Sequence, residues 1–328
     1  IAHTKLAESS VKNTVNLLNQ DCTIPFIARY RKEATGNLDE VQIGDIVKYK
    51  EQFEGLEKRK KTILKALEEQ DVLTPELKAK VNACQDSTAL EDVYLPFKKS
   101  RKTKAETARQ NGLEPLAKII MSQNSNDLDA TAQSYVKGNI KSLDDALEGA
   151  RHIIAEWISE RTDIRSNLRN QLERQAVIST KVVKSKKDEE NAQKFRDYFE
   201  WEEALSRMPS HRLLAILRAE HEGFIRVKIR IDNERILDSI DRKLIKSQNA
   251  CADQIELAIS DAYKRLLFPS LSNEALQKAK NKADEAAISV FAKNLKQLLL
   301  GSPLGEKRVL AIDPGFRSGC KVVCLDEK

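Results

Sequence analysis

Asp313 stands where a carboxylate could bind a metal ion, directly before Pro314 and Gly315. The run from Val309 to Ile312 is typical of a short buried strand, and a carboxylate at the end of a strand can reach a divalent cation. Nucleases that use two Mg²⁺ ions hold them with several such carboxylates. An Asp-x-Gly turn also opens the phosphate loop of some ATPases, and an Asp can simply cap its own turn. Asp313 is therefore the one candidate catalytic residue, and a nuclease would need more carboxylates.

Cys320 and Cys324 lie on a second predicted strand, from Cys320 to Leu325. Residues four apart on a strand share a face but are separated by about 13 Å, at about 3.3 Å per residue. One Zn²⁺ needs its thiolates at about 2.3 Å, so the two cysteines are expected to be packing thiols. The 4 histidines show no metal-ligand spacing with cysteines or acids. We expect neither a metal nor another cofactor.

Two stretches rich in Lys and Arg could bind an anionic polymer. Residues 98–109 carry six basic residues and one acidic residue, and their lack of apolar periodicity predicts a loop. Residues 161–187 carry eight basic residues against Asp163 and Glu173. Such density suits the phosphate backbone of RNA or DNA, although acids nearby in space can neutralise it. The predicted phosphate contacts are Lys98, Lys99, Arg101, Lys102, Lys104, Arg161, Arg165, Arg169, Lys181, Lys184, Lys186 and Lys187.

Spacing groups some of these cations. Arg161, Arg165 and Arg169 recur every four residues, which places side chains on one face of a helix. We expect this stripe to lie along a phosphate backbone. A smaller basic group, ARYRKE at 28–33, could contact phosphate as well, or Arg29 could pair with Glu33.

The composition predicts a mostly helical protein that positions these residues. Among 328 residues there are only 11 Gly and 8 Pro, and aromatic residues make up 5 %. Few chain breakers and few aromatics favour helices over an all-β fold. A net charge of +6 permits an anionic partner. The 5 cysteines are an odd number, which is typical of free thiols in a reducing compartment. The sequence has no run of about 18 apolar residues, the length needed to cross a membrane. We therefore expect a cytoplasmic protein without a membrane partner.

Apolar spacing places most of the helices. It predicts one long helix from Asp39 to about Gln70 and helical segments from Asn233 to Leu300. Shorter helices are expected to begin at Thr74-Pro75, at Ser87 and at Ser142, because these residue types favour the first positions of a helix.

The pattern changes to β in the middle of the chain. Strands are predicted for AVISTKVV from Ala176 and for FIRVKIRID at 224–232, where apolar residues alternate with Arg226, Lys228 and Arg230. Period two with basic residues outward is typical of a half-buried strand. Helices followed by a β-ribbon are in the order of a winged helix-turn-helix, but the sequence does not assign a recognition helix.

Four blocks of this sequence, in order along the chain, resemble one protein family. They are IPFIARYRKEATGNLDE (24–40), ALEDVYLPFKKSRKTKAETARQNGLEPLA (89–117), KFRDYFEWEEALSRMPSHRLLAILRAEHEG (194–223) and VLAIDPGFRSGCKVVCLD (309–326). Together they resemble the Tex family of bacterial transcription-accessory proteins. The last block is similar to the opening of that family's YqgF-like domain, which has the RNase H-like fold, and Asp313 matches its first carboxylate.

The resemblance implies a mainly α fold: a multi-helical bundle with a small helix-turn-helix-like α/β insert and the first hairpin of an RNase H-like domain. Family members continue into helix-hairpin-helix modules and an OB-fold RNA-binding domain, so we expect this chain to be part of a longer protein. The expected segments are a helical Tex N-terminal region at 1–145, a helix-turn-helix-like region with a β-ribbon at 146–232, a helical connector at 233–306 and the truncated start of the YqgF-like domain at 307–328.

The resemblance implies a non-enzymatic nucleic-acid-binding scaffold for transcription, with little sequence preference on RNA or DNA. One alternative is an RNase H-like nuclease with Asp313 as a Mg²⁺ ligand. Another is a protein-interaction platform whose long helices dock on RNA polymerase or the ribosome. An exposed apolar patch of more than a few hundred Å² on the helices would favour the platform.

Joint substitution of Lys98, Lys99, Arg101 and Lys102 by Glu is expected to weaken binding to all nucleic-acid sequences alike, because phosphate contacts carry no sequence information. Fluorescence anisotropy with labelled oligonucleotides of several sequences measures this effect. Unchanged affinity would mean that the stretch is only a solvated surface.

Overall fold

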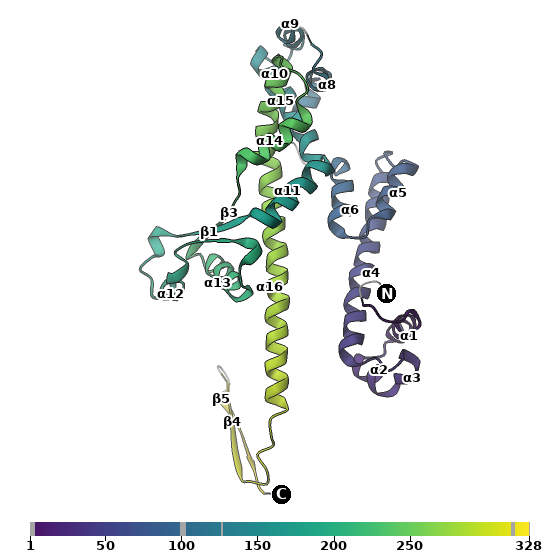
Figure 1. The fold of residues 1–328 in the computed structure, drawn as a ribbon, viewed down its shortest axis with the longest axis vertical. Helices are drawn as coiled ribbons and strands as arrows, with labels where there is room; N and C mark the ends of the chain where they lie inside the picture. Colours follow the sequence, from purple (N-terminus) through teal and green to yellow (C-terminus); the bar gives the residue numbers. More distant parts are fainter. Residues whose placement is uncertain (1–3, 99–102, 126, 316–318, 328) are drawn as a thin grey trace. The chain divides into compact units, whose positions relative to one another are not determined.

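A computed structural model describes residues 4–98, 103–125, 127–315 and 319–327 of the chain (Figure 1). The described chain is mainly α, which confirms the predicted fold class, and its strands form one three-stranded and one two-stranded sheet. None of its helices combines the length and the apolar character that crossing a bilayer requires.

The chain divides into two compact units, each built from two separate stretches. The first unit comprises Ile1–Ser166 and Ile236–Leu267, and the second comprises Asn167–Arg235 and Phe268–Lys328. The first unit is therefore discontinuous, since the chain leaves it and later returns. The four segments predicted from the sequence are each continuous and do not include this return of the chain to the first unit. Their boundaries stay a prediction.

Helix α4 (Glu40–Glu68) is the long helix that the apolar spacing predicts. It begins after Asp39, whose carboxylate accepts a hydrogen bond from the Gln42 backbone N–H at 2.8 Å. The Gln42 side chain accepts one from the Asp39 N–H at 3.1 Å, which completes a capping box. Two short helices pack on the first turns of α4 around Ile27 and Ile43. The helices that precede α4 are α1 (Glu8–Leu18), α2 (Ile24–Tyr30) and α3 (Lys32–Thr35).

Helices α5 (Pro75–Ala83) and α6 (Ser87–Tyr94) pack on the second half of α4, and the 3₁₀ turn η1 (Leu95–Phe97) follows. Both helices begin where the sequence predicts. The Thr74 hydroxyl accepts a hydrogen bond from the Leu77 N–H, and the Asp86 carboxylate caps α6 in the same way. The shared core consists of Leu56, Ile63, Leu67, Val81, Cys84 and Leu90.

The expected loop at 98–109 is wrong for its second half, because α7 (Lys104–Gln110) begins there. The Thr103 hydroxyl accepts a hydrogen bond from the Glu106 N–H and so caps the helix. The buried residues of α7 are Ala105 and Ala108. Because alanine is small and only weakly apolar, these two residues do not produce the apolar periodicity by which a helix is recognised in a sequence. The helices that follow are α8 (Glu114–Ser122) and α9 (Leu128–Gln133).

Helix α10 (Leu143–Glu160) is the centre of the first unit. It begins at the predicted Ser142, which forms a capping box with Asp145. Its buried face includes Ile153 and Ile154, both fully buried. Gly149 lets α10 approach α7 and α8 closely, because a Cβ at this position would collide with the Leu113 side chain. The helices that follow β3 (Ile225–Arg230) are α14 (Asn233–Leu244), α15 (Ala250–Asp261) and a π-helical segment, Ala262–Leu267. Of these, α15 and the π-helical segment pack on α10.

The second unit is built on an antiparallel sheet with the strand order β2-β1-β3. β1 (Val177–Val182) and β3 (Ile225–Arg230) are the predicted strands, whereas β2 (Glu200–Ala204) is an addition that the sequence analysis missed. β2 reads EWEEA, and three acids in five residues hide its β character. Helix α13 (Ser210–His221) and the long α16 (Phe268–Leu299) pack together beside the sheet.

One face of this sheet is covered by a core of apolar side chains. Ile178 of β1 is fully buried, and Phe195, Ile216, Phe224 and Ala283 of α16 belong to the same cluster. Helix α11 (Thr162–Gln175) leads from the first unit into the second. The short segments of the second unit are η2 (Lys184–Lys186), α12 (Glu190–Gln193), η3 (Arg196–Tyr198) and η4 (Leu205–Arg207).

The last described elements form a two-stranded hairpin, β4 (Val309–Gly315) with β5 (Gly319–Leu325). The turn expected at Asp313-Pro314-Gly315 is wrong, because β4 continues through these residues and Asp313 pairs with Lys321. The hairpin leaves Leu310 62 % exposed and Val322 56 % exposed. Two strands are marginal in water on their own and need further packing to be stable.

Gln123, directly after α8, joins two distant parts of the first unit. Its side-chain Nε2 donates a hydrogen bond to the Leu244 carbonyl at 2.8 Å. Its Oε1 accepts hydrogen bonds from the backbone N–H groups of Lys246 at 2.8 Å and Ser247 at 3.1 Å. Asn249 donates to the Gln123 carbonyl at 2.9 Å. One buried side-chain amide thus provides hydrogen-bond partners for three backbone groups in and beside the loop between α14 and α15.

Gln123→Ala is expected to lower the free energy of unfolding by about 2–4 kcal/mol, because it leaves several backbone groups near this loop without a partner. Urea unfolding followed by circular dichroism measures the loss. Gln133→Ala, at the exposed end of α9, is the matched control and should change stability by less than about 0.5 kcal/mol. Equal stability of the two variants would contradict the role given to Gln123.

Candidate nucleic-acid interface

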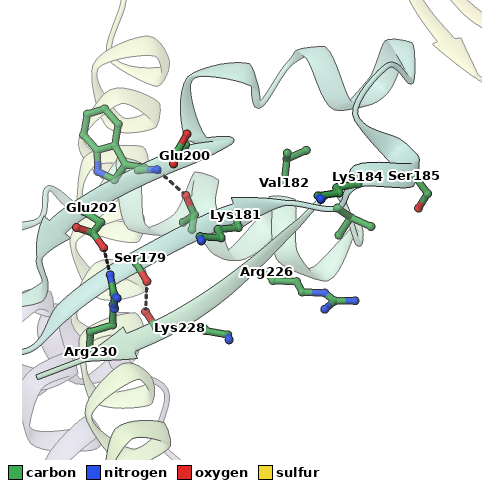
Figure 2. A pocket seen from close by; sticks show the side chains of 13 residues that line it. Ser179, Lys181, Val182, Lys184, Ser185, Glu200, Glu202, Arg226, Lys228 and Arg230 are labelled. Atoms are coloured by element: carbon green, nitrogen blue, oxygen red, sulfur yellow. Dashed lines mark hydrogen bonds and ion pairs between the residues drawn. The ribbon is translucent and has the colours of Figure 1, made fainter. Parts of the chain in front are cut away.

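A hollow of about 1010 Å³ lies on the sheet of the second unit, and most of its charged side chains are basic (Figure 2). Strand β3 contributes Arg226, Lys228 and Arg230 to it, and Lys181 of β1 and Lys184 lie beside them. On β3 the apolar residues between these cations are less exposed, as the predicted alternation requires. We call these five cations and the surface they line the basic hollow.

Strand register brings the cations of the basic hollow together. Lys181 lies directly opposite Arg226 in the pairing of β1 with β3, and Ser179 lies opposite Lys228. Side chains directly opposite in an antiparallel pair have Cβ atoms about 4.5–5.5 Å apart, and like charges there repel. Within the described residues, Lys181, Lys184, Arg226 and Lys228 form no ion pair. Only Lys181 of these four has a carboxylate directly opposite it in the sheet, that of Glu200, so an anion bound at the other three would relieve their repulsion.

Strand β2 gives the hollow an acidic margin. Glu200 lies opposite Lys181, and Glu202 accepts a hydrogen bond from Arg230 at 2.5 Å (Figure 2). Trp201 is half-buried, and the Arg212 guanidinium lies 5.0 Å from the centre of its ring. Phosphate is repelled by the two carboxylates, so the positive side of the hollow is the one formed by β1 and β3.

The basic hollow contains two of the predicted phosphate contacts, Lys181 and Lys184. Lys187 is exposed, and Lys186 lies 5.5 Å from the centre of the Phe224 ring. The predicted set did not include the cations of β3, although their alternation is visible in the sequence. The missing information was the pairing of β3 with β1, which joins residues far apart in the chain.

The predicted arginine stripe is corrected by the structure. Arg161 lies outside α11 in extended backbone and donates two hydrogen bonds to Asp163, each at 3.0 Å. Arg165 is buried and donates to Asp92 at 2.7 Å. Arg169 donates to Glu274 at 2.5 Å. All three arginines have carboxylate partners, so they do not form a free cationic face.

The basic stretch at 98–109 is described only in part. Lys98, after η1, and Lys104, the first residue of α7, are both exposed. The other three predicted contacts in this stretch lie outside the described residues; they are Lys99, Arg101 and Lys102. Phosphate binding by this stretch stays a prediction.

The candidate catalytic residue Asp313 is exposed on β4, opposite Lys321. Cys320 and Cys324 are exposed as well, so the expectation that they are packing thiols is wrong for the described chain. Among the described residues, no three His, Cys, Asp or Glu side chains come close enough to hold a metal ion.

Two carboxyl groups near the end of α10, those of Glu160 and Asp163, have shifted pKa values. Burial, together with the Glu156 charge, raises the pKa of the Glu160 carboxyl to about 7, and the Arg109 charge opposes this rise. The hydrogen bond from Arg161 lowers the pKa of the Asp163 carboxyl. Glu160 therefore titrates near neutral pH, although it has no place in the basic hollow.

Two family models match the chain. The Tex-like protein N-terminal domain matches residues 1–68, and the Tex central region-like model matches residues 123–291, which is more than half of the chain. The chain belongs to the Tex family. This confirms the resemblance found in the sequence blocks.

Relatives with curated names are similar to the Tex-family chain over most of its length. Transcriptional accessory protein Tex of Neisseria gonorrhoeae is 39 % identical, across 97 % of this chain and 42 % of its own length. YdcI of Bacillus subtilis is 38 % identical, across 98 % and 45 %. Human S1 RNA-binding domain-containing protein 1 is 31 % identical, across 95 % and 33 %. The chain thus spans less than half the length of these relatives.

Glu160→Gln is expected to remove a pH dependence of stability. The folded-state pKa of about 7 exceeds the ordinary value of 4.5, so the folded state holds this proton more tightly than the unfolded state. Stability is then greatest below pH 4.5 and falls as the pH rises to 7. Partial exposure limits the loss to about 1–2 kcal/mol.

Urea unfolding of wild type and variant at several pH values between 4.5 and 8 measures this loss. Glu68→Gln, at an exposed position at the end of α4, is the matched control and should keep the wild-type pH profile. A wild-type profile in Glu160→Gln as well would contradict the raised pKa.

Proposed function

We propose that this Tex-family chain is a non-enzymatic, nucleic-acid-associated scaffold that contacts the phosphate backbone of RNA or DNA through the basic hollow. The observation that carries the proposal is the set of four exposed cations without an ion pair among the described residues, Lys181, Lys184, Arg226 and Lys228. Cations that lie close together without ion-pair partners can bind a polyanion and release its counterions.

The hollow favours the backbone over the bases. Alternate residues of β3 are about 6.8 Å apart, so its cations form a regular row that matches a regular polyanion of any sequence. Trp201, the aromatic residue of the hollow, is half-buried and already occupied by Arg212. Little sequence preference follows from such contacts.

The names of the relatives support the same role. One relative is named a transcriptional accessory protein and another an S1 RNA-binding domain-containing protein. We infer from these names that the whole protein acts on transcription or RNA. We propose in addition that it acts in the cytoplasm, with RNA polymerase or the ribosome as the candidate protein partners.

A second candidate function, the protein-interaction platform, is favoured by α16. The second half of this helix exposes large apolar side chains, among them Ile288, Phe291 and Leu298, which are 65 %, 67 % and 77 % exposed. Contiguous apolar surface of this kind marks interaction sites. The two functions use different surfaces and are compatible with each other.

Replacing Lys181, Arg226 and Lys228 together by Ala is expected to weaken binding to single-stranded RNA, single-stranded DNA and duplex DNA alike. Fluorescence anisotropy titrated with salt measures this, and the slope of log affinity against log salt should fall by about 2–3, since each lost phosphate contact removes about 0.7–0.9.

The matched control removes the same charge from another exposed part of the second unit, by replacing Lys293, Lys296 and Lys307 with Ala. In this control the slope of log affinity against log salt should fall by less than half as much as in the hollow variant. A triple variant of the hollow that binds like wild type would exclude the hollow as the interface, and an equal loss in the control would mean that only net charge matters.

A further inference from the structure

Helix α2 of the first unit presents two aromatic rings to solvent. Phe26 is 37 % exposed and Tyr30 is 67 % exposed. They are four residues apart and therefore share a helix face, and their ring centres lie 5.4 Å apart at an interplanar angle of 45°. Ile27 and Ala28 are buried in the core on the other side of the helix. The rings are thus not needed for packing the helix.

Three cations adjoin the rings in sequence, and one of them contacts a ring. Arg29, Arg31 and Lys32 are all exposed, and no ion pair joins any of them to a carboxylate within the described residues. The alternative pairing of Arg29 with Glu33 is therefore not present. The Arg31 guanidinium lies 5.4 Å from the centre of the Phe26 ring. The face combines π surface with unneutralised positive charge.

Packing and hydrogen bonds fix the backbone that carries this aromatic-basic face, which comprises Phe26, Tyr30, Arg29, Arg31 and Lys32. Ile27 is fully buried, and the Thr35 hydroxyl donates to the carbonyls of Arg31 and Lys32, both at 3.2 Å. Asn13 of α1 donates to the Ala34 carbonyl at 2.7 Å. A rigid face loses little entropy when a ligand binds.

We infer that Phe26 and Tyr30 form a stacking site for the bases of single-stranded nucleic acid, with Arg29, Arg31 and Lys32 contacting the adjacent phosphates. Exposed rings beside cations suit a ligand that carries both flat π faces and negative charge. A duplex keeps its bases stacked inside, so it cannot use the rings. An acidic peptide would use the cations but leave the rings without a matching partner.

The inference rests on the proposed nucleic-acid function but uses another surface, in the other compact unit. The basic hollow binds phosphate and does not distinguish single strands from duplexes. The aromatic-basic face adds that distinction. Stacking of one base is worth about a fivefold to a hundredfold change in affinity.

The test replaces Phe26 and Tyr30 together by Ala and measures anisotropy with four probes. They are a mixed-sequence single strand of DNA, the same strand as RNA, an abasic single strand of DNA of equal length, and a DNA duplex. We expect the variant to bind the normal single strand at least about fivefold more weakly than wild type. Binding to the abasic strand and to the duplex should not change.

Two further variants separate ring chemistry from apolar area. Phe26→Tyr with Tyr30→Phe keeps both rings and should restore the wild-type preference for bases, whereas Phe26→Leu with Tyr30→Leu should not. Phe291→Ala removes an equally exposed ring from α16 and is the matched control. Circular dichroism checks that each variant is folded.

Unchanged binding of the normal single strand by the Ala variant would overturn the stacking site and leave the face for a protein partner. An equal loss on all probes would overturn it too, since rings that stack on bases do not act on abasic DNA. Both results leave the proposed function standing if the hollow variant still loses affinity. Absence of binding to every probe at low salt would overturn both proposals.

Discussion

Strand β1 is the element on which the second unit depends, because it pairs with both β2 and β3. Its register places Ile178 opposite Ile229 and Lys181 opposite Arg226. A slip of one residue would turn every side chain to the other face of the sheet, so that cations would enter the core and isoleucines would face water. The register that buries the core is thus the same register that assembles the basic hollow, and the chain cannot change one without the other.

Much of the fold could be predicted because its signals are local. Caps such as Asp39, Thr74 and Ser142 act within three residues, and the structure confirms the helices that they start. The charges could not be judged locally, since Arg165 meets Asp92 across 73 residues of chain. A window of sequence shows a run of cations but not the acid that neutralises it. The hollow was missed in part for the same reason, because its cations meet only through strand pairing.

The two proposed surfaces show why positive charge alone does not define an interface. In α11 and its flanks, closely spaced arginines form ion pairs with carboxylates of other helices. In the basic hollow four of the five cations have no such partner among the described residues, and only Arg230 is paired, with Glu202, yet no free ring accompanies them. On α2 the unneutralised cations lie beside exposed rings. What a basic stretch can bind is decided by what else the fold brings to it.

The discontinuity of the first unit has a consequence for the order of events during synthesis. Helix α10 packs on α15, which belongs to the returning stretch Ile236–Leu267. A ribosome adds about 5–20 residues per second, so the intervening stretch Asn167–Arg235 delays these partners by several seconds. During that interval α10 can already pack on α7 and α8, but the side of α10 that contacts α15 has no partner on the growing chain.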